Sequence, residues 1–152
     1  MTELDPIDRK ILAQLQRDSD ISLDALGEAV GLSRNACWRR VKQLEQDGVI
    51  RKRVALLDPE KLGLGLSVFI LVRTRRHDAD WLAQFARATA ALPQITGVYR
   101  MSGDLDYLLR ARVADMGEYD RLYKALTSRI ELSDVSASFV MEEIKDTTAL
   151  PL

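Results

Sequence analysis

Apolar residues near the start of the chain recur at the spacing of a helix. Ile7 and Ile11 lie four positions apart and therefore share one helix face. Asp5 followed by Pro6 is typical of a helix start, because the carboxylate caps the first turn and a proline at the first helical position gives up no hydrogen bond. The pattern predicts a helix over residues 6–18.

Two further helix starts follow at short intervals. Ser22 and Ser33 each stand directly before a run with helical periodicity, which is the position that a capping hydroxyl occupies. Gly31 is placed to end the helix that begins after Ser22, so this helix is about eight residues long. The next helix meets no Gly or Pro before Gly48 and is predicted over residues 34–46. Two helices joined by so short a turn match a helix-turn-helix.

The composition becomes β-like after the third helix and changes again at residue 58. Val49 and Ile50 precede a basic triplet, and this segment is predicted to form a short strand or wing. Residues 58–65 contain one proline and two glycines, which indicate a linker. The sequence therefore predicts a first domain over residues 1–57 and a second over residues 66–152.

The second domain alternates strand and helix patterns. Its apolar runs and a hairpin signal at Gly103-Asp104 predict the order β-α-β-β-α-β, which is the ferredoxin-like, or split βαβ, arrangement. The fold class is therefore α+β, a winged helix-turn-helix followed by a ferredoxin-like domain. Strands are predicted at residues 66–73, 97–102, 107–113 and 135–144, and helices at residues 80–92 and from residue 115 onward.

One face of the predicted sheet requires a cover. Right-handed crossovers place both helices on one face, whereas the strand over residues 66–73 is apolar on both faces. We expect the helix over residues 80–92 to place Leu82 and Phe85 against the first face. An isologous homodimer is the commonest way to bury the second face. The pattern thus predicts a dimer that forms through the sheet.

Composition excludes several classes of protein. With 47% hydrophobic and 30% charged residues, the chain has the balance of an ordinary soluble protein. It shows neither the roughly 18 consecutive apolar residues of a membrane span nor the basic start of a secretory signal, so a cytoplasmic location without membrane contact is expected. Cys37 and His77 are the only cysteine and histidine, so one chain cannot build a zinc site or a Cys/His pair. No metal or cofactor is expected.

The near-neutral charge of the whole chain conceals one basic segment. The formal net charge is −1, but residues 33–53 hold seven Lys or Arg against two acidic residues. The third predicted helix lies in this segment and separates its side chains by character. Cys37, Val41 and Leu44 fall within about 60° on one side, opposite a polar group of Asn35, Arg39, Lys42 and Gln46.

The polar side of this helix carries the residue types that contact DNA. In the major groove, bidentate hydrogen bonds suit Asn35 to adenine and Arg39 to guanine. Contacts with the DNA backbone are expected for other basic or hydroxyl-bearing side chains of the segment, namely Ser33, Arg34, Arg40, Lys42, Arg51 and Lys52.

Simpler structural interpretations stand beside each of these assignments. A charged run on its own is more often a solvated face, and Lys42 can be a plain solvent-facing residue. Arg51 and Lys52 can serve only to keep an edge strand from aggregating. Cys37 suits a small core residue better than a redox sensor, and Trp38 is expected to pack beside the apolar side rather than to wedge between bases. Only the whole arrangement favours DNA binding.

The chain resembles the Lrp/AsnC, or feast/famine, family of bacterial and archaeal transcriptional regulators. The resemblance spans both domains in order, and the residues that carry it are 4–12, 30–33, 37–45, 48–50 and 102–109. It implies a winged helix-turn-helix, a ferredoxin-like domain often called RAM, and dimers that assemble into tetramers or octamers. It also implies an amino-acid effector that shifts assembly and DNA affinity. Residues 55–63 and 147–152 look most like a cysteine-responsive branch.

The predicted hairpin over residues 102–106 has the chemistry to bind a free amino acid. Asp104 and Asp106 can accept hydrogen bonds from an ammonium group, and N–H groups around Gly103 can donate to a carboxylate. In the family this hairpin lines a pocket at the contact between dimers, which implies that Met101, Gly103, Asp104 and Asp106 bind the effector. Without the resemblance, an ordinary acidic turn is the simpler interpretation.

Two functions from different classes remain after an enzyme is set aside. An enzyme is disfavoured because the one histidine lies at a predicted strand-to-helix junction and no nucleophile stands beside a base. The first function is a sequence-specific regulator of transcription that binds a near-palindromic site in double-stranded DNA and responds to an amino acid. The alternative is a ligand-binding accessory regulator that acts through oligomerisation without an effector-controlled DNA switch. The basic helix favours the first.

Overall fold

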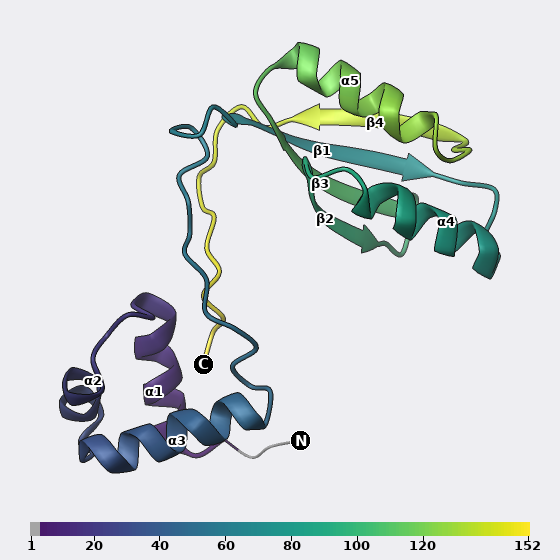
Figure 1. Ribbon diagram of the computed structural model, residues 1–152. Helices are drawn as coiled ribbons and strands as arrows, with labels where there is room; N and C mark the ends of the chain where they lie inside the picture. Colours follow the sequence, from purple (N-terminus) through teal and green to yellow (C-terminus); the bar gives the residue numbers. More distant parts are fainter. Residues whose placement is uncertain (1–3) are drawn as a thin grey trace. The chain divides into compact units, whose positions relative to one another are not determined.

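The computed structural model describes residues 4–152, which form two compact units (Figure 1). Unit 1 takes the chain up to Leu56 together with Lys145–Leu152, and unit 2 takes Leu57–Ile144. Residues 145–152 are predicted in the second domain, whereas they cluster with the first unit. Among the described residues, no helix has both the length and the apolar character that crossing a membrane requires.

Unit 1 is built from three helices, α1 (Pro6–Arg17), α2 (Leu23–Val30) and α3 (Arg34–Gln46). Each begins directly after the capping side chain that the sequence predicts. The bounds of α3 and the eight-residue length of α2 agree with the prediction. The helix-turn-helix is therefore confirmed.

Two glycines shape the turn between α2 and α3. Gly31 has a φ of 75°, in the left-handed region that favours glycine. This geometry lets the N–H of Leu32 donate to the carbonyl of Gly27 over 2.8 Å, which ends α2 in a Schellman-type turn. A Cβ at Gly27 would lie 2.7 Å from the carbonyl oxygen of Leu32. The turn thus packs directly against α2.

A small apolar core holds the three helices together. Burial raises the pKa of the Cys37 thiol, which keeps it protonated and suits a core residue rather than a reactive one. The fully buried members of the core come from all three helices and are Ile11, Leu12, Leu26, Val30, Cys37, Val41 and Leu44. The apolar side predicted for α3 is therefore the side that packs.

The segment after α3 differs from the prediction. A short strand or wing is expected there, but residues 51–58 are irregular and largely exposed. Gly48 reverses the chain with a φ of 71°, and the N–H of Ile50 then donates to the carbonyl of Leu44 over 3.0 Å. Within the described chain no second strand runs beside this segment, so it lacks the ladder of hydrogen bonds that would make it a strand.

Unit 2 has the predicted β-α-β-β-α-β order and one antiparallel sheet with the strand order β2-β3-β1-β4. Several element ends differ from expectation, and the strand expected over residues 97–102 lies two residues earlier in the chain. The last strand stops at Phe139, because this residue pairs with Val68 near the start of β1 and little of β1 remains beyond it. The helix expected from Asp80 begins one residue earlier, after its cap Asp78. The elements are β1 (Leu66–Arg73), α4 (Ala79–Ala90), β2 (Ile95–Arg100), β3 (Tyr107–Val113), α5 (Met116–Thr127) and β4 (Asp134–Phe139).

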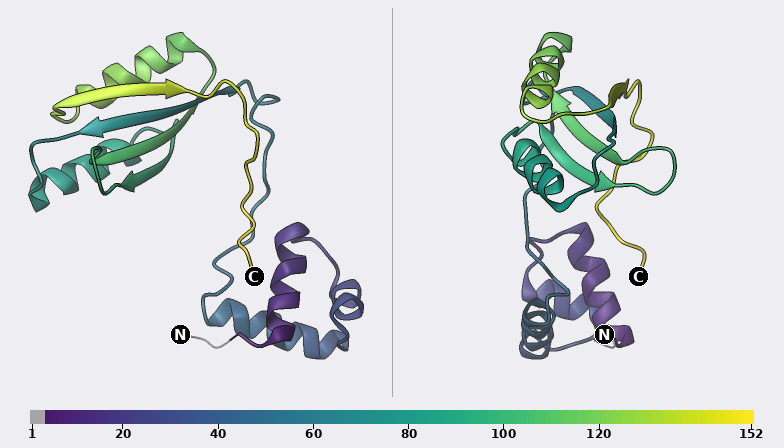
Figure 2. Two further views of the ribbon diagram at one scale, coloured as in Figure 1. Left: turned by 180° about the vertical axis from the view of Figure 1, so that it is seen from behind. Right: turned by 90° about the vertical axis from the view of Figure 1, so that its right-hand side faces the viewer.

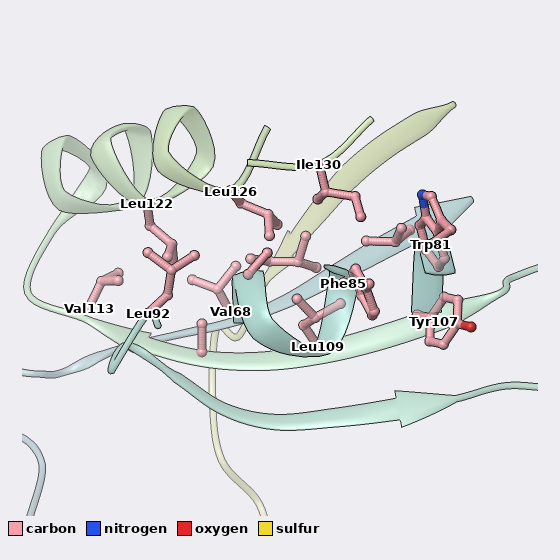
Figure 3. Packing of buried hydrophobic residues seen from close by; sticks show 14 residues of the cluster. Val68, Trp81, Phe85, Leu92, Tyr107, Leu109, Val113, Leu122, Leu126 and Ile130 are labelled. Carbon is pink, nitrogen blue, oxygen red and sulfur yellow. The ribbon is translucent and has the colours of Figure 1, made fainter. Parts of the chain in front are cut away.

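Both helices of unit 2 pack on the same face of the sheet, as predicted (Figures 2 and 3). Trp81 and Phe85 of α4 stack with their ring centroids 5.0 Å apart and lie over β1 and β3. The expectation that Leu82 faces this core is wrong, because Leu82 is exposed and Trp81 takes the buried position. The indole N–H of Trp81 donates to the carbonyl of Glu131 over 3.0 Å, so its one polar atom is satisfied.

The opposite face of the sheet carries no helix in the described chain. Phe69 and Leu71 of β1 lie on this face beside Arg110 and Leu108 of β3, and all four are partly exposed. The strand β1 is therefore apolar on both faces, as its sequence indicates.

The C-terminal segment binds α1 of unit 1 through one glutamine side chain. The amide oxygen of Gln16 accepts from the N–H of Leu150 over 2.6 Å, and its amide nitrogen donates to the carbonyl of Leu150 over 3.1 Å. The side-chain amide thus pairs with a backbone amide in the way that two strands pair. This contact joins residues 134 positions apart and explains why residues 145–152 cluster with unit 1.

Candidate nucleic-acid interface and ligand-binding hairpin

The exposed face of α3 is polar and basic. Asn35, Arg39, Lys42 and Gln46 are all exposed, while Cys37 and the other apolar residues of α3 are buried on the opposite side. Arg39 has no ion-pair partner among residues 4–152. Its five N–H donors therefore face solvent without an acceptor that DNA would have to displace.

Two other cations of α3 have acidic neighbours that are easily exchanged. Arg34 lies 3.4 Å from Asp24, with both side chains largely exposed. Lys42 lies 2.8 Å from Glu45, and this hydrogen bond is the largest cause that lowers the pKa of Glu45. Exposed ion pairs contribute little to stability, so both cations remain able to bind phosphate.

Arg40 is positioned differently from its neighbour Arg39. Its Nη1 lies 2.6 Å from Oδ2 of Asp5 and 2.8 Å from Oδ1 of Asp8, and these hydrogen bonds raise the pKa of Arg40 further. The backbone N–H of Asp8 and the guanidinium of Arg40 hold the pKa of Asp5 below its usual value. Arg40, which the sequence predicts to contact DNA phosphate, thus links α3 to the first turn of α1.

The basic triplet after α3 lies in the irregular segment. Arg51 and Lys52 are exposed. Arg53 donates to the carbonyl of Ser19 over 3.4 Å and lies 3.3 Å from Glu45, so it links this segment to the helices. The structure thus leaves the first two side chains available and gives the third a structural partner. Ser33 lies at the other end of α3, where its hydroxyl oxygen accepts from the N–H of Ala36 over 3.3 Å.

Trp38 does not pack as the sequence analysis expects. Its side chain is 49% exposed and is not part of the apolar cluster of unit 1 in the described chain. The error comes from the helical phase, because Trp38 lies about 100° from Cys37 and therefore beyond the edge of the buried side. A large apolar ring is left on the surface of the helix that carries the predicted DNA contacts.

The hairpin between β2 and β3 brings the four predicted effector residues together. The N–H of Met101 donates to the carbonyl of Asp106 over 2.9 Å and closes the hairpin. Gly103 has a φ of 108°, a conformation that other residues rarely adopt. Asp104 is exposed, and its backbone carbonyl accepts from Nε of Arg73 over 3.0 Å.

Asp106 is already partly occupied by its own chain. Its Oδ2 accepts from the backbone N–H of Thr74 over 2.8 Å, and its Oδ1 lies 3.9 Å from Nε2 of His77. Arg73 and Thr74 are not among the predicted site residues, and they reach the hairpin because Val72 pairs with Tyr107 across the sheet. The predicted antiparallel pairing of β1 with β3 could have indicated these two residues, because it places the end of β1 beside the start of β3. Among the described residues, no cluster of three His, Cys, Asp or Glu side chains could hold a metal ion.

Comparison with known proteins agrees with this geometry. A family model described as winged helix-turn-helix DNA-binding matches residues 4–51, and the model of the Lrp/AsnC ligand binding domain matches residues 67–150. The chain belongs to the Lrp/AsnC family. Its two matched regions contain α1 to α3 and the sheet domain with the hairpin, in that order.

Members of the Lrp/AsnC family resemble the chain over nearly its whole length. The DNA-binding transcriptional activator DecR of Escherichia coli (strain K12) is 51% identical and covers 98% of this chain and 99% of its own. The glutamate uptake regulatory protein of Zymomonas mobilis is 53% identical, and the match covers 99% of this chain and 92% of that protein. This Lrp/AsnC protein is therefore a DNA-binding transcriptional regulator with a ligand-binding domain.

Solved structures of the Lrp/AsnC family have the same fold. An AsnC family transcriptional regulator from Agrobacterium tumefaciens is 49% identical, covers 97% of each chain and has a TM-score of 0.94. A transcriptional regulator from Neisseria meningitidis in complex with L-Met is 39% identical, covers 98% of this chain and 97% of its own, and also has a TM-score of 0.94. The α+β fold with its N-terminal winged helix-turn-helix is thereby confirmed.

Proposed function

We propose that the protein is a homodimeric, sequence-specific regulator whose DNA affinity and assembly respond to a small amino acid. The observation that carries the proposal is the division of α3 into a buried apolar side and an exposed side with Asn35 and Arg39. In a dimer, two such helices about one helical turn of DNA apart contact the half-sites of a near-palindrome.

The residues of the interface divide between base contacts and backbone contacts. Arg39, exposed and without an ion-pair partner in the described chain, is assigned to guanine, and Asn35 to adenine. Phosphate contacts are assigned to Ser33, Arg34, Lys42, Arg51 and Lys52. Arg40 is assigned to holding α3 against α1 through Asp5 and Asp8, which keeps the base-contacting residues in position.

Dimerisation is assigned to the uncovered face of the sheet. Phe69, Leu71 and Leu108 form an apolar group on this face, and an isologous pairing buries the group of both protomers at once. Assembly of dimers into tetramers or octamers follows from the family resemblance, and DNA binding by several protomers increases the apparent affinity.

The effector is assigned to the hairpin. The exposed carboxylate of Asp104 suits the ammonium group of an amino acid, and the backbone around Gly103 suits its carboxylate. Met101 lies exposed at the base of the hairpin and suits an apolar side chain. Asp106 accepts a hydrogen bond from the N–H of Thr74 through Oδ2, and its other carboxylate oxygen is assigned to the ammonium group of the effector. A homologue in complex with L-Met supports an amino-acid ligand.

The experiment is a titration of the purified protein on duplex DNA from the region upstream of its own gene, at one salt concentration. It is repeated with each of the twenty amino acids. Specific binding that one amino acid shifts, and that Asp104→Ala makes insensitive to it, is the expected result. Specific binding that no amino acid alters would favour the alternative, an accessory regulator that acts through oligomerisation without an effector-controlled DNA switch. Absence of specific binding would overturn the proposal.

A further inference from the structure

Trp38 combines exposure with an unusual set of neighbours. It is the fifth residue of α3, and 49% of its side chain is exposed. Residues three and four positions away are neighbours on a helix surface. Those on the exposed side of Trp38 are Arg34, Asn35 and Lys42, of which two are cationic and none is acidic.

The direction of the helix brings the indole toward the end of α3 that enters the groove. Side chains on an α-helix lean toward its N-terminus, so the ring of Trp38 is expected to lie over the turn that begins at Ser33. In a helix-turn-helix, residues near the N-terminus of the second helix contact base edges. Trp38 therefore flanks Asn35, the residue assigned to adenine.

Charge favours DNA over a protein partner as the group that covers this ring. A protein surface placed on Trp38 would also cover Arg34, which is 64% exposed, and Lys42, which is 50% exposed. Arg34 and Lys42 have one exposed carboxylate neighbour each, Asp24 and Glu45, and a protein surface would have to desolvate these ion pairs. DNA instead supplies phosphates on both sides of the groove that these cations can bind. The nearest acid along this flank, Glu45, is already held by Lys42 and Arg53.

We propose that the indole of Trp38 packs against thymine C5-methyl groups in the major groove and adds a preference for thymine beside the bases bound by Asn35 and Arg39. The inference rests on the proposed function. The chemistry is the apolar contact by which side chains distinguish thymine from the other bases. Its consequence is that part of the sequence preference comes from a group that forms no hydrogen bond.

The first test measures where Trp38 lies, with and without DNA, by acrylamide quenching of tryptophan fluorescence. Trp81 is 1% exposed and Trp38 is 49% exposed, so the quenchable signal belongs to Trp38. Trp38→Phe supplies the reference with Trp81 alone. We expect quenching in the free protein and protection when the upstream duplex is added. A Trp38 signal already protected without DNA would mean that another protomer covers the ring and would overturn the proposal.

The second test pairs a protein change with a DNA change. Duplexes are prepared in which deoxyuridine replaces thymidine, which removes the methyl groups and leaves every hydrogen-bonding group in place. The loss should be about fourfold in affinity for each methyl contacted, in the wild type and in Trp38→Phe. Trp38→Ala should bind the thymine duplex about tenfold more weakly and show no further loss with deoxyuridine. An equal deoxyuridine penalty in wild type and Trp38→Ala would refute the contact.

Controls separate this inference from folding and from the proposed function. Leu82→Ala removes an exposed apolar side chain from unit 2 and should leave both duplexes bound as before. Circular dichroism checks that Trp38→Ala keeps the helices, which its place outside the core predicts. If Arg39→Ala weakens binding and Trp38→Ala does not, only the role of Trp38 fails. If the wild type has no sequence preference, the proposed function fails.

Discussion

Two adjacent arginines on α3 have different surroundings at the residue scale. Arg39 faces solvent, whereas Arg40 lies between Asp5 and Asp8 of the first turn of α1. Helical periodicity predicts that Arg39 and Arg40 project from α3 in different directions. It does not predict which acidic residues of α1 contact Arg40, because those contacts depend on how α1 packs. The sequence thus allowed the exposed polar side of α3 to be predicted and left the partner of Arg40 open.

The two arginines can be separated by experiment. Arg39→Ala should lower the affinity for specific DNA by roughly 1–3 kcal/mol, because the bidentate base contact is lost, and should leave thermal stability nearly unchanged. Arg40→Ala should lower the unfolding midpoint of unit 1 by about 5 °C, because two carboxylates lose their partner. Fluorescence anisotropy and thermal melts of both variants give the comparison. Equal effects of the two variants on DNA affinity would contradict the assignment.

Asp5 makes the stability of unit 1 depend on acid. The N–H of Asp8 and the guanidinium of Arg40 lower the pKa of Asp5 from its ordinary value of 3.8. The carboxylate therefore contributes stability above this value, and the contribution is lost as the pH falls through the lower pKa of the folded state. Urea unfolding between pH 5 and about pH 2 measures it.

Asp5→Asn is the matched variant for this pH dependence. Asparagine caps a helix about as well as aspartate, so the substitution keeps the cap of α1 and removes the charge. We expect the variant to be less stable at pH 5 and to lose less stability on acidification than the wild type. Two parallel stability curves would show that the charge of Asp5 plays no part.

At the element scale, local signals predicted the helices better than the strands. Caps such as Asp5, Ser33 and Asp115 act within one turn, so they are visible in sequence. Strand ends depend on partners far along the chain. The last strand stops at Phe139 because its pairing with β1 ends near Val68, and no apolar pattern within residues 135–144 indicates this. The strand expected after α3 is absent for the same reason, because no partner strand lies beside residues 51–58 in the described chain.

Gly27 is the element-scale residue on which the helix-turn-helix depends. Gly27→Ala places a Cβ 2.7 Å from the carbonyl oxygen of Leu32, and backbone cannot move aside as a side chain can. We expect a loss of about 1–3 kcal/mol in unfolding free energy, measured by urea denaturation. The loss should be accompanied by weaker DNA binding, because the turn sets the direction of α3.

Gly117→Ala on α5 is the control for Gly27→Ala. The atom nearest to its new Cβ is a side-chain oxygen of Asp115 at 3.2 Å, and alanine favours the helix more than glycine does. This variant should lose much less stability than Gly27→Ala. A loss as large as that of Gly27→Ala would show that the close approach to Leu32 is not the cause.

At the scale of the whole molecule, the uncovered sheet face is the surface to which we assign dimerisation. The apolar character of β1 on both faces allowed this face to be predicted from sequence, because alternation is a property of the strand itself. The contacts of the hairpin between β2 and β3 with Arg73 and Thr74 were not predicted, because they follow from the pairing of β1 with β3.

A charge on the uncovered face should separate the protomers. Leu71→Glu places a carboxylate among Phe69 and Leu108 on this face. The expected result in equilibrium sedimentation at micromolar concentration is a shift from dimer to monomer, together with weaker binding to a two-half-site duplex. Leu82→Glu, which adds the same charge on the helical side at an exposed position, should remain a dimer. Dimers in both variants would place the interface elsewhere.

The pairing of Gln16 with Leu150 makes the C-terminal segment part of the DNA-binding unit. Because residues on both sides of unit 2 belong to unit 1, unit 2 is an insertion within the DNA-binding unit rather than an appendage at its end. A graft of this DNA-binding unit onto another sensor must therefore carry two junctions, one after Leu56 and one before Lys145. The chain therefore passes between the two units twice, once after Leu56 and once before Lys145.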